Sequence, residues 1–276
     1  MKKIIAAFDG LKYSPSTAHY AIQLAKASGA HLVGIFLDDF TYHSYHLTKA
    51  NYRQLLKNKL EGDEKDQLTR RRSAELFEKA CQEAGLNYAI HHDYSLAIQE
   101  LMHESIYADL IVVDKNESFN KQKEEPPANF IRYILADAEC PVLIVPSKFK
   151  PIEKTILLYD GSPSSVFAIK MFSYLLPDLK TLSTEVVSVR EDDLNRHLPD
   201  NHLMKEFMKR HFPEADYKVM QGSPEALIVE YLKNRKQNEV LVLGAYQRSI
   251  VSRLFKASMA DRLMLQLKTP LFIAHR

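Results

Sequence analysis

Short apolar runs alternate with amphipathic stretches along this chain, most clearly in its second half. Runs rich in Val, Ile and Leu predict strands that are covered on both faces, at residues 155–159, 184–189, 217–220, 240–243 and 271–275. Between them, apolar residues recur with the period of one helix face, which predicts helices at residues 163–176, 224–234 and 257–267. Strands that alternate with helices in this way predict right-handed crossovers and a mainly parallel sheet with helices on both faces.

The first half of the chain repeats this pattern. KKIIAAFDG at residues 2–10 matches KTILLYDG at 154–161, and each segment is followed by a Ser-Pro pair that is typical of a helix start. Further on, ADLIVVD matches NEVLVLG, and CPVLIVP matches TPLFIAH. The repeat predicts two domains, residues 1–146 and 152–276, joined by the short polar segment SKFKPIEK. The first domain has the larger helical insert, at residues 47–86.

Composition limits the classes of partner. The chain of 276 residues has 37 Lys and Arg against 35 Asp and Glu, and this net charge of +2 gives no extended positive field, so nucleic acid is not an expected partner. Cys81 and Cys140 are its only cysteines and form no CxxC pair, which predicts a reducing compartment and therefore the cytoplasm. Asp9 interrupts the N-terminal apolar run well before it reaches the length of a membrane span, so no membrane association is expected.

Several catalytic signatures are missing from the sequence. It contains no G-x-S-x-G nucleophile elbow, no G-x-x-x-x-G-K-[ST] loop and no G-x-G-x-x-G fingerprint. The pairs His43 and His46, and His91 and His92, do not have the spacing of a zinc motif. We therefore predict no catalytic residue and no metal ligand.

The most informative positions follow the predicted strands. Ligands of open α/β sheets bind at the carboxyl ends of strands, near the point where the strand order reverses. Asp160-Gly161 and Gly244 fall there. Each also has an ordinary structural interpretation, because Asp-Gly favours turns and glycine is common where a strand ends.

The order of these elements, present twice, resembles the tandem, two-domain form of the universal stress protein family, of the UspA-like type. The resemblance implies two Rossmann-like domains of the adenine nucleotide alpha hydrolase-like type, each with a mainly five-stranded parallel sheet covered by helices. It also implies that the last strands of the halves pair, which makes an intramolecular pseudo-dimer; a homodimer of the whole chain is the further expectation.

The same resemblance implies an adenine nucleotide site, with ATP as the ligand. Nucleotide-binding members have a loop of the form G-x2-G-x9-G-[ST] after the fourth strand. In the second half, Gly244 matches its first glycine and Ser258 its final hydroxyl, but Gln247 and Ala257 replace the other two glycines. Asp160, followed by Gly161, matches the position that contacts base and ribose, and Val189 lies near the position that contacts adenine. These matched positions are the implied ligand-binding residues: Asp160, Gly161, Val189, Gly244 and Ser258.

Two features decide whether such a loop still binds nucleotide. A glutamine in a left-handed conformation carries roughly 1–2 kcal/mol of strain, which corresponds to about tenfold or more in affinity. Arg248, Arg253 and Lys256 supply positive charge around the loop, or are simply solvated. The matching segment of the first half, residues 114–130, has no glycine and carries Asp114 and Glu117 where phosphate would approach.

The sequence therefore predicts a non-catalytic cytoplasmic universal stress protein, a ligand-responsive or interaction module in stress adaptation, with a degenerate ATP site in the second half. Two alternatives remain open at this point. One is a pure scaffold for protein partners that binds no nucleotide. The other is a slow ATPase.

Overall fold

The computed structural model describes residues 1–37, 64–93, 97–118, 127–191, 196–233, 235, 237–244 and 259–275. The first half contains β1 (Lys3–Asp9), α1 (Pro15–Ser28), β2 (His31–Leu37), α3 (Glu64–Glu83), β3 (Tyr88–Asp93), α4 (Ala97–Ser105), β4 (Leu110–Asp114), α5 (Asn129–Asp137) and β5 (Val142–Val145). The second half contains β6 (Lys154–Leu158), α6 (Pro163–Leu175), the 3₁₀ helix η2 (Pro177–Thr181), β7 (Ser183–Arg190), α7 (Asn201–His211), β8 (Asp216–Gln221), α8 (Pro224–Lys233), β9 (Glu239–Gly244), α9 (Met259–Gln266) and β10 (Leu271–Ala274).

These strands form one ten-stranded sheet in the order β3-β2-β1-β4-β5-β10-β9-β6-β7-β8. Neighbouring strands are parallel within each half, as the alternation of strands and helices predicts. The halves meet where β5 and β10 pair antiparallel, with Phe272 opposite Leu143. The predicted pairing of the two last strands is therefore present, and the α/β fold class is confirmed.

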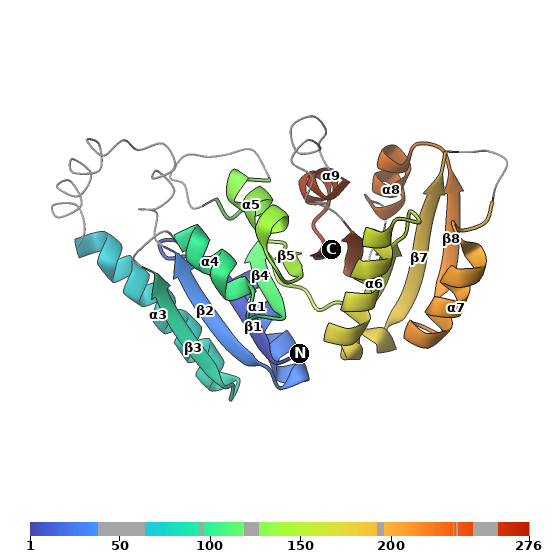
Figure 1. The fold of residues 1–276 in the computed structure, drawn as a ribbon. Coiled ribbons are helices and arrows are strands. Elements are labelled where there is room, and N and C mark those ends of the chain that lie inside the picture. Colours follow the sequence, from blue (N-terminus) through green and yellow to red (C-terminus); the bar gives the residue numbers. More distant parts are fainter. Residues whose placement is uncertain are drawn as a thin grey trace.

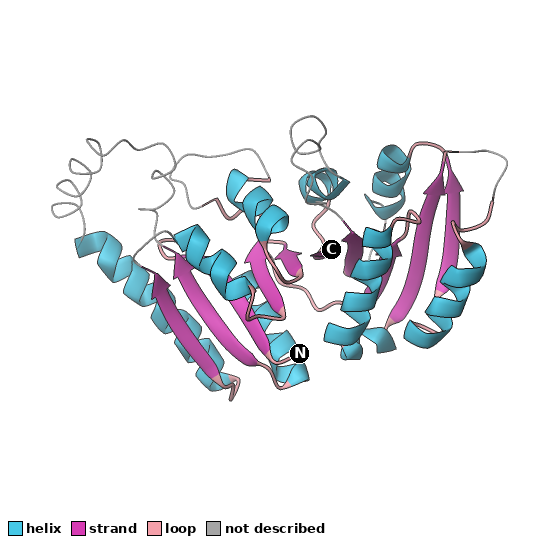
Figure 2. Ribbon diagram, viewed as in Figure 1, coloured by secondary structure: helices cyan, strands magenta, loops and turns pink. Residues whose placement is uncertain are grey.

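Helices cover both faces of the sheet (Figures 1 and 2). Alternate residues of β1 enter opposite cores: Ile4 and Phe8 belong to the core under α1, α3, α6 and α7, whereas Ile5 belongs to the core under α4, α5, α8 and α9. Because the central strands are buried on both faces, they are continuously apolar rather than alternating with polar residues.

Matching Ser-Pro pairs begin the two helices that follow the first strand of each half. The Ser14 hydroxyl accepts a hydrogen bond from the Thr17 amide at 3.3 Å, and the Ser162 hydroxyl accepts one from Ser165 at 3.2 Å. Each hydroxyl satisfies one of the amides that the first turn leaves without a helical partner. The local sequence thus fixes where α1 and α6 start, a short turn after the ends of β1 and β6.

The insert of each half lies between its second and third strands. In the first half, α3 accounts for part of the helical region predicted at residues 47–86, and residues 47–63 lie outside the described part of the chain. The predicted helix at 257–267 is α9, of which the structure describes Met259 onward. No helix within the described ranges is both long and apolar enough to cross a bilayer.

Candidate functional site

The strand order reverses between β6 and β9 in the second half. From β6 the chain continues to β7 on one side, and β9 is followed by β10 on the other, so the carboxyl ends of β6 and β9 form the switch point at which open α/β sheets bind ligands. Asp160 and Gly161 follow β6 after Tyr159, and Gly244 is the last residue of β9. The structure therefore brings three of the five predicted residues to one edge, which we call the second-half edge.

The structure does not place the other two predicted residues, Val189 and Ser258, at this edge. Val189 lies inside β7, the strand predicted at residues 184–189, opposite Met220 of β8, and packs against the core under α8 and α9. Strand β7 extends to Arg190 because its pairing with β8 continues to Gln221. Ser258 lies outside the described residues, as do Gln247 and Ala257.

Asp160 stabilises the turn that leads into α6. Its Oδ1 accepts a hydrogen bond from the Ser162 amide at 2.8 Å, and the residue remains exposed to solvent. The surrounding protein partly removes water from the carboxylate, which would raise its pKa, but hydrogen bonds from Ser162 and Ser165 outweigh this effect and hold the pKa of Asp160 below its usual value. The edge therefore presents a stable negative charge, an acceptor suited to hydroxyl and amino groups.

Gly161 is required both by its backbone conformation and by its neighbour. Its φ of 85° lies in the left-handed region, and a Cβ there would lie 2.7 Å from Cβ of Pro199. The Tyr159 hydroxyl donates a hydrogen bond to the Pro199 carbonyl oxygen at 3.1 Å. The segment before α7 thus closes against the end of β6, a contact that the sequence pattern does not reveal.

Gly244 allows the start of α6 to lie directly against the end of β9. A Cβ at this position would be 2.3 Å from the carbonyl carbon of Ser164 and 2.6 Å from the amide nitrogen of Ser165. The need for glycine is therefore one of space rather than of a left-handed turn. As a result, the first turn of α6, whose amides favour negatively charged groups, lies at the switch point itself.

A groove of about 640 Å³ opens beside this edge, between α6 and α7. Tyr159 and Gly161 line it next to the strand end, Phe167 lines it from α6, and Phe207 lines it from α7. Its α7 side begins at Asp200, whose φ of 42° makes it the one non-glycine residue with a left-handed backbone in the described ranges. A lining rich in aromatic and apolar side chains suits a flat ring.

The corresponding edge of the first half has different chemistry. Asp114, which matches Gly244 in the repeat, accepts hydrogen bonds from the hydroxyls of Ser14 at 3.0 Å and Ser147 at 3.1 Å. Glu117 is only 4% exposed, and burial, together with the carboxylates of Asp9 and Asp114, raises its pKa to about 8. The acidic residues expected to oppose phosphate do lie at this switch point.

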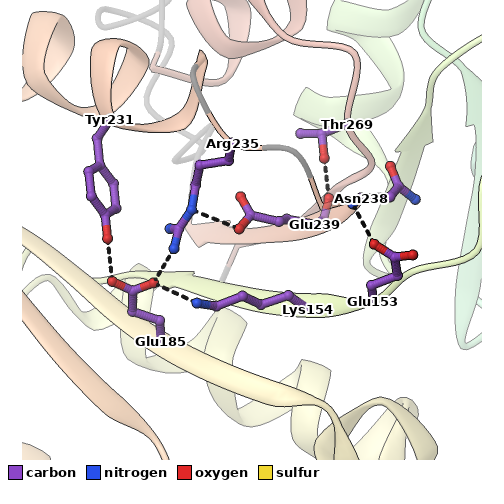
Figure 3. A network of polar contacts seen from close by, with 8 residues as sticks. All are labelled: Glu153, Lys154, Glu185, Tyr231, Arg235, Asn238, Glu239 and Thr269. Carbon is purple, nitrogen blue, oxygen red and sulfur yellow. Dashed lines mark hydrogen bonds and ion pairs between the residues drawn. The ribbon is translucent and has the colours of Figure 1, made fainter.

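A charged cluster occupies the opposite edge of the second half, at the amino ends of its strands (Figure 3). Glu185 accepts hydrogen bonds from Lys154 at 3.0 Å, from Arg235 at 2.8 Å and from the Tyr231 hydroxyl at 2.5 Å. Burial would raise the pKa of Glu185, but these three donors lower it to about 2. Arg235 also pairs with Glu239 at 2.9 Å. The carboxylates have cationic partners within the protein, which indicates a structural role.

Nucleophilic and metal chemistry find little support among the described residues. Cys81 and Cys140 are both buried. Mainly because of this burial, the pKa of each thiol is raised to about 12. A thiol with such a pKa is unreactive at neutral pH. The described ranges contain no group of three or more His, Cys, Asp or Glu residues arranged to hold a metal ion.

These features define a doubly wound α/β protein of two halves, with a switch point in the strand order of each. No family model matches the sequence, and no curated protein matches it. Solved structures do. A universal stress protein from Archaeoglobus fulgidus DSM 4304 aligns with a TM-score of 0.68 at 14% identity, over 99% of this chain and 96% of its own. A protein from Pseudomonas aeruginosa UCBPP-PA14, described as a universal stress protein, aligns at 0.60 and 13% identity, over 100% and 93%.

The cytoplasmic domain of a prokaryotic cation chloride cotransporter also aligns, with a TM-score of 0.51 at 11% identity, over 99% of this chain and 94% of that domain. At sequence identities this low, the similarity shows that the proteins share a fold and shows nothing about function. The chain therefore has the fold of the tandem universal stress proteins, as its sequence resemblance implies.

Proposed function

We propose that this chain acts as a tandem universal stress protein that binds an adenine nucleotide, with ATP as the ligand, at the second-half edge. The observation that carries the proposal is the convergence of Asp160, Gly161 and Gly244 at one switch point, where Gly244 admits the first turn of α6. A carboxylate suited to ribose and base, beside a helix start suited to phosphate, matches the two chemical ends of a nucleotide. The aromatic groove between α6 and α7 supports the same ligand class.

The proposal places the ligand in the second half alone. The first-half edge holds Asp114 and Glu117 where the second half has Gly244 and a loop containing Arg248, Arg253 and Lys256. The Asp114 carboxylate repels phosphate, whereas the basic residues of the second-half loop attract it. One nucleotide per chain is therefore the expected stoichiometry.

We further propose that the bound nucleotide is not turned over and that the protein works as a ligand-responsive module in the cytoplasm during stress. Asp160 is the carboxylate at the edge, and its hydrogen bonds keep its pKa low, which makes it a weak proton acceptor. A slow ATPase would need a stronger base. Phosphate release no faster than in Asp160→Ala supports the non-catalytic proposal, and release that depends on Asp160 contradicts it.

Isothermal titration calorimetry with Mg-ATP tests the binding proposal. Asp160→Ala and Asp9→Ala form a matched pair, because each carboxylate accepts a hydrogen bond from an amide of its own turn, Asp160 from Ser162 and Asp9 from Leu11. We expect saturable binding of one nucleotide that weakens about tenfold or more in Asp160→Ala, as for loss of a charged hydrogen bond, and is unchanged in Asp9→Ala. Equal weakening in both variants, or no binding by the wild-type protein, contradicts the proposal.

A scaffold without nucleotide is the second candidate, and one observation favours it. Pro199 already lies against Gly161, and Tyr159 is hydrogen-bonded to the same segment, so part of the second-half edge is covered by the chain itself. If the edge binds a ligand, loosening the contact of the Pro199 segment with Tyr159 and Gly161 should strengthen binding. If Tyr159→Phe, which removes the hydrogen bond to Pro199, leaves ATP binding undetectable at millimolar concentrations, the scaffold candidate is supported.

A further inference from the structure

One side chain of the first half reaches a helix of the second. Lys115 directly follows β4, and its Nζ donates hydrogen bonds to the carbonyl oxygens of Met264 and Leu267, each at 2.9 Å. Met264 lies in the last turn of α9 and Leu267 directly follows the helix. Carbonyls at a helix end lack intrahelical partners and carry partial negative charge, so an ammonium group both satisfies and stabilises them.

The base of Lys115 is fixed by the first-half edge. Its own amide donates to the Val145 carbonyl oxygen at 2.9 Å, which continues the pairing of β4 with β5. The preceding residue, Asp114, is held by the hydroxyls of Ser14 and Ser147. Lys115 is partly buried, and this burial lowers the pKa of its ammonium while Asp114 opposes the shift. The lysine therefore extends from a rigid support rather than from a free loop.

In the sequence, the start of α9 directly follows the segment that matches the nucleotide motif. The helix starts at Met259, the residue after Ser258, which matches the hydroxyl position of the nucleotide motif. Within the second half, α9 contacts α8 through an exposed ion pair between Arg262 and Glu225 at 2.9 Å and packs Leu263 into the core. Because the helix is short, fixing its carboxyl end also restricts the position of its amino end.

We infer that Lys115 is a positioning residue through which the first half orders α9 and, with it, the ligand edge of the second half. The part that concerns the ligand rests on the proposed function. The acidic first-half edge thus has a structural role, because Asp114 fixes the position of the lysine that contacts the other half. The repeat places Ala245 at the position of Lys115. Because alanine has no side-chain hydrogen-bond donor, the second half cannot support the first half in the same way.

Hydrogen exchange of the whole chain without nucleotide tests the ordering of α9. Lys115→Met is compared with Lys268→Met, because Lys268 is an exposed lysine next to the same helix end, for which the described structure shows no hydrogen bond. Both variants remove one charge there, but only Lys115→Met removes the two hydrogen bonds. We expect amides of residues 260–267 to exchange about tenfold faster in Lys115→Met, at wild-type rates in Lys268→Met, and near wild-type rates in Lys115→Arg.

Two results of this experiment overturn the inference. One is equal exchange of α9 in Lys115→Met and Lys268→Met. The other is a uniform increase across β4, β5 and α9, which would show a general loss of stability rather than release of one helix.

Calorimetry with Mg-ATP on the same variants provides the second readout. A several-fold weaker affinity in Lys115→Met, with Lys268→Met unchanged, supports the positioning role, and equal affinities in the two variants contradict it. If the wild-type protein binds no ATP, the proposed function fails, whereas the exchange of α9 still decides whether Lys115 orders that helix.

Discussion

At the scale of single residues, Gly244 shows how one position serves both packing and the ligand edge. Its missing Cβ is what lets the backbone of Ser164 and Ser165 approach the end of β9. The glycine is therefore needed whether or not a nucleotide is bound. Any ligand role depends on this packing, because it is the start of α6 that the contact places at the switch point.

Gly244→Ala should therefore destabilise the protein in the absence of ligand. A methyl group 2.3 Å from the Ser164 carbonyl carbon forces a backbone shift, for which we expect a loss of about 3 kcal/mol in the free energy of unfolding. Gly85→Ala is the control, since a Cβ there meets no atom within 4 Å and the cost comes only from its φ of 67°, roughly 1 kcal/mol. Urea unfolding measures both, and equal losses would contradict the packing account.

Glu117 makes stability depend on pH. Its pKa is raised from 4.5 to about 8 in the folded protein, so the folded state retains the proton while the unfolded chain releases it near pH 4.5. Stability from this group is fully present below pH 4.5 and is lost as the pH rises towards 8. At low pH, the free energy of unfolding of Glu117→Gln should equal that of the wild type. Between pH 4.5 and about 8, it should exceed the wild-type value by up to about 1.4 kcal/mol for each pH unit above 4.5.

Urea unfolding of both proteins at intervals across this pH range gives the comparison. If the difference in free energy of unfolding between the two proteins does not change with pH, folding does not raise the pKa of Glu117, and the prediction is wrong.

At residue scale, the positions of Asp160-Gly161 and Gly244 at strand ends could be predicted from the sequence, but the contacts that require these glycines could not. Asp160-Gly161 and Gly244 follow apolar runs, and strand ends can be read from such runs. The contacts of Pro199 with Gly161 and of Ser164 with Gly244 join residues that are distant in the sequence, so no local pattern signals them. Strand β7 was predicted to end at Val189, one residue early, because its last pair with β8, Arg190 with Gln221, is polar and leaves no apolar signature.

At the scale of elements, α1 and α6 begin with the same signal but in different surroundings. Both have Ser at the N-cap and Pro at the first helical position. The Ser14 hydroxyl also donates to Asp114, which is only 6% exposed, whereas Ser162 bonds within its own turn. The same cap is thus local in the second half and connects two elements in the first.

Ser14→Ala should consequently cost more than Ser162→Ala. Loss of a helix cap costs about 1 kcal/mol, which is the expectation for Ser162→Ala. Ser14→Ala additionally leaves the buried Asp114 with one donor fewer, and we expect about 2–3 kcal/mol. Chemical denaturation of the two variants measures the difference, and equal losses would show that the contact between Ser14 and Asp114 contributes nothing net.

Most elements were predictable because their apolar period is strong. Strands β6, β7, β9 and β10 and helices α6 and α8 lie where the pattern predicts them. Helix α7 was expected only as part of a variable insert, because only Met204 and Met208 are buried in it, although Leu203 and Phe207 are also apolar. Helix η2 begins at Pro177, shortly after α6 ends at Leu175, and a 3₁₀ helix this short leaves no periodic signal.

At the scale of the whole molecule, the contacts that join the halves include the antiparallel strand pair β5–β10 and the hydrogen bonds of Lys115. Strands β5 and β10 would each be an exposed edge if the halves were separated. We expect residues 1–146, prepared alone, to self-associate through β5, as the intact chain pairs β5 with β10. Analytical ultracentrifugation measures this, and a folded monomer at all concentrations would show that the strand pair adds little to association.

The central claim is that the two halves share a fold but differ in function, with the ligand at the second-half edge. Hydrogen exchange of the full chain with and without saturating Mg-ATP tests it most directly. The account predicts slower exchange at residues 160–166 and 244–260, and unchanged exchange at residues 9–16 and 114–118, where the carboxylates of the first-half edge lie. Protection at the first-half edge, or none at either edge, would contradict the account.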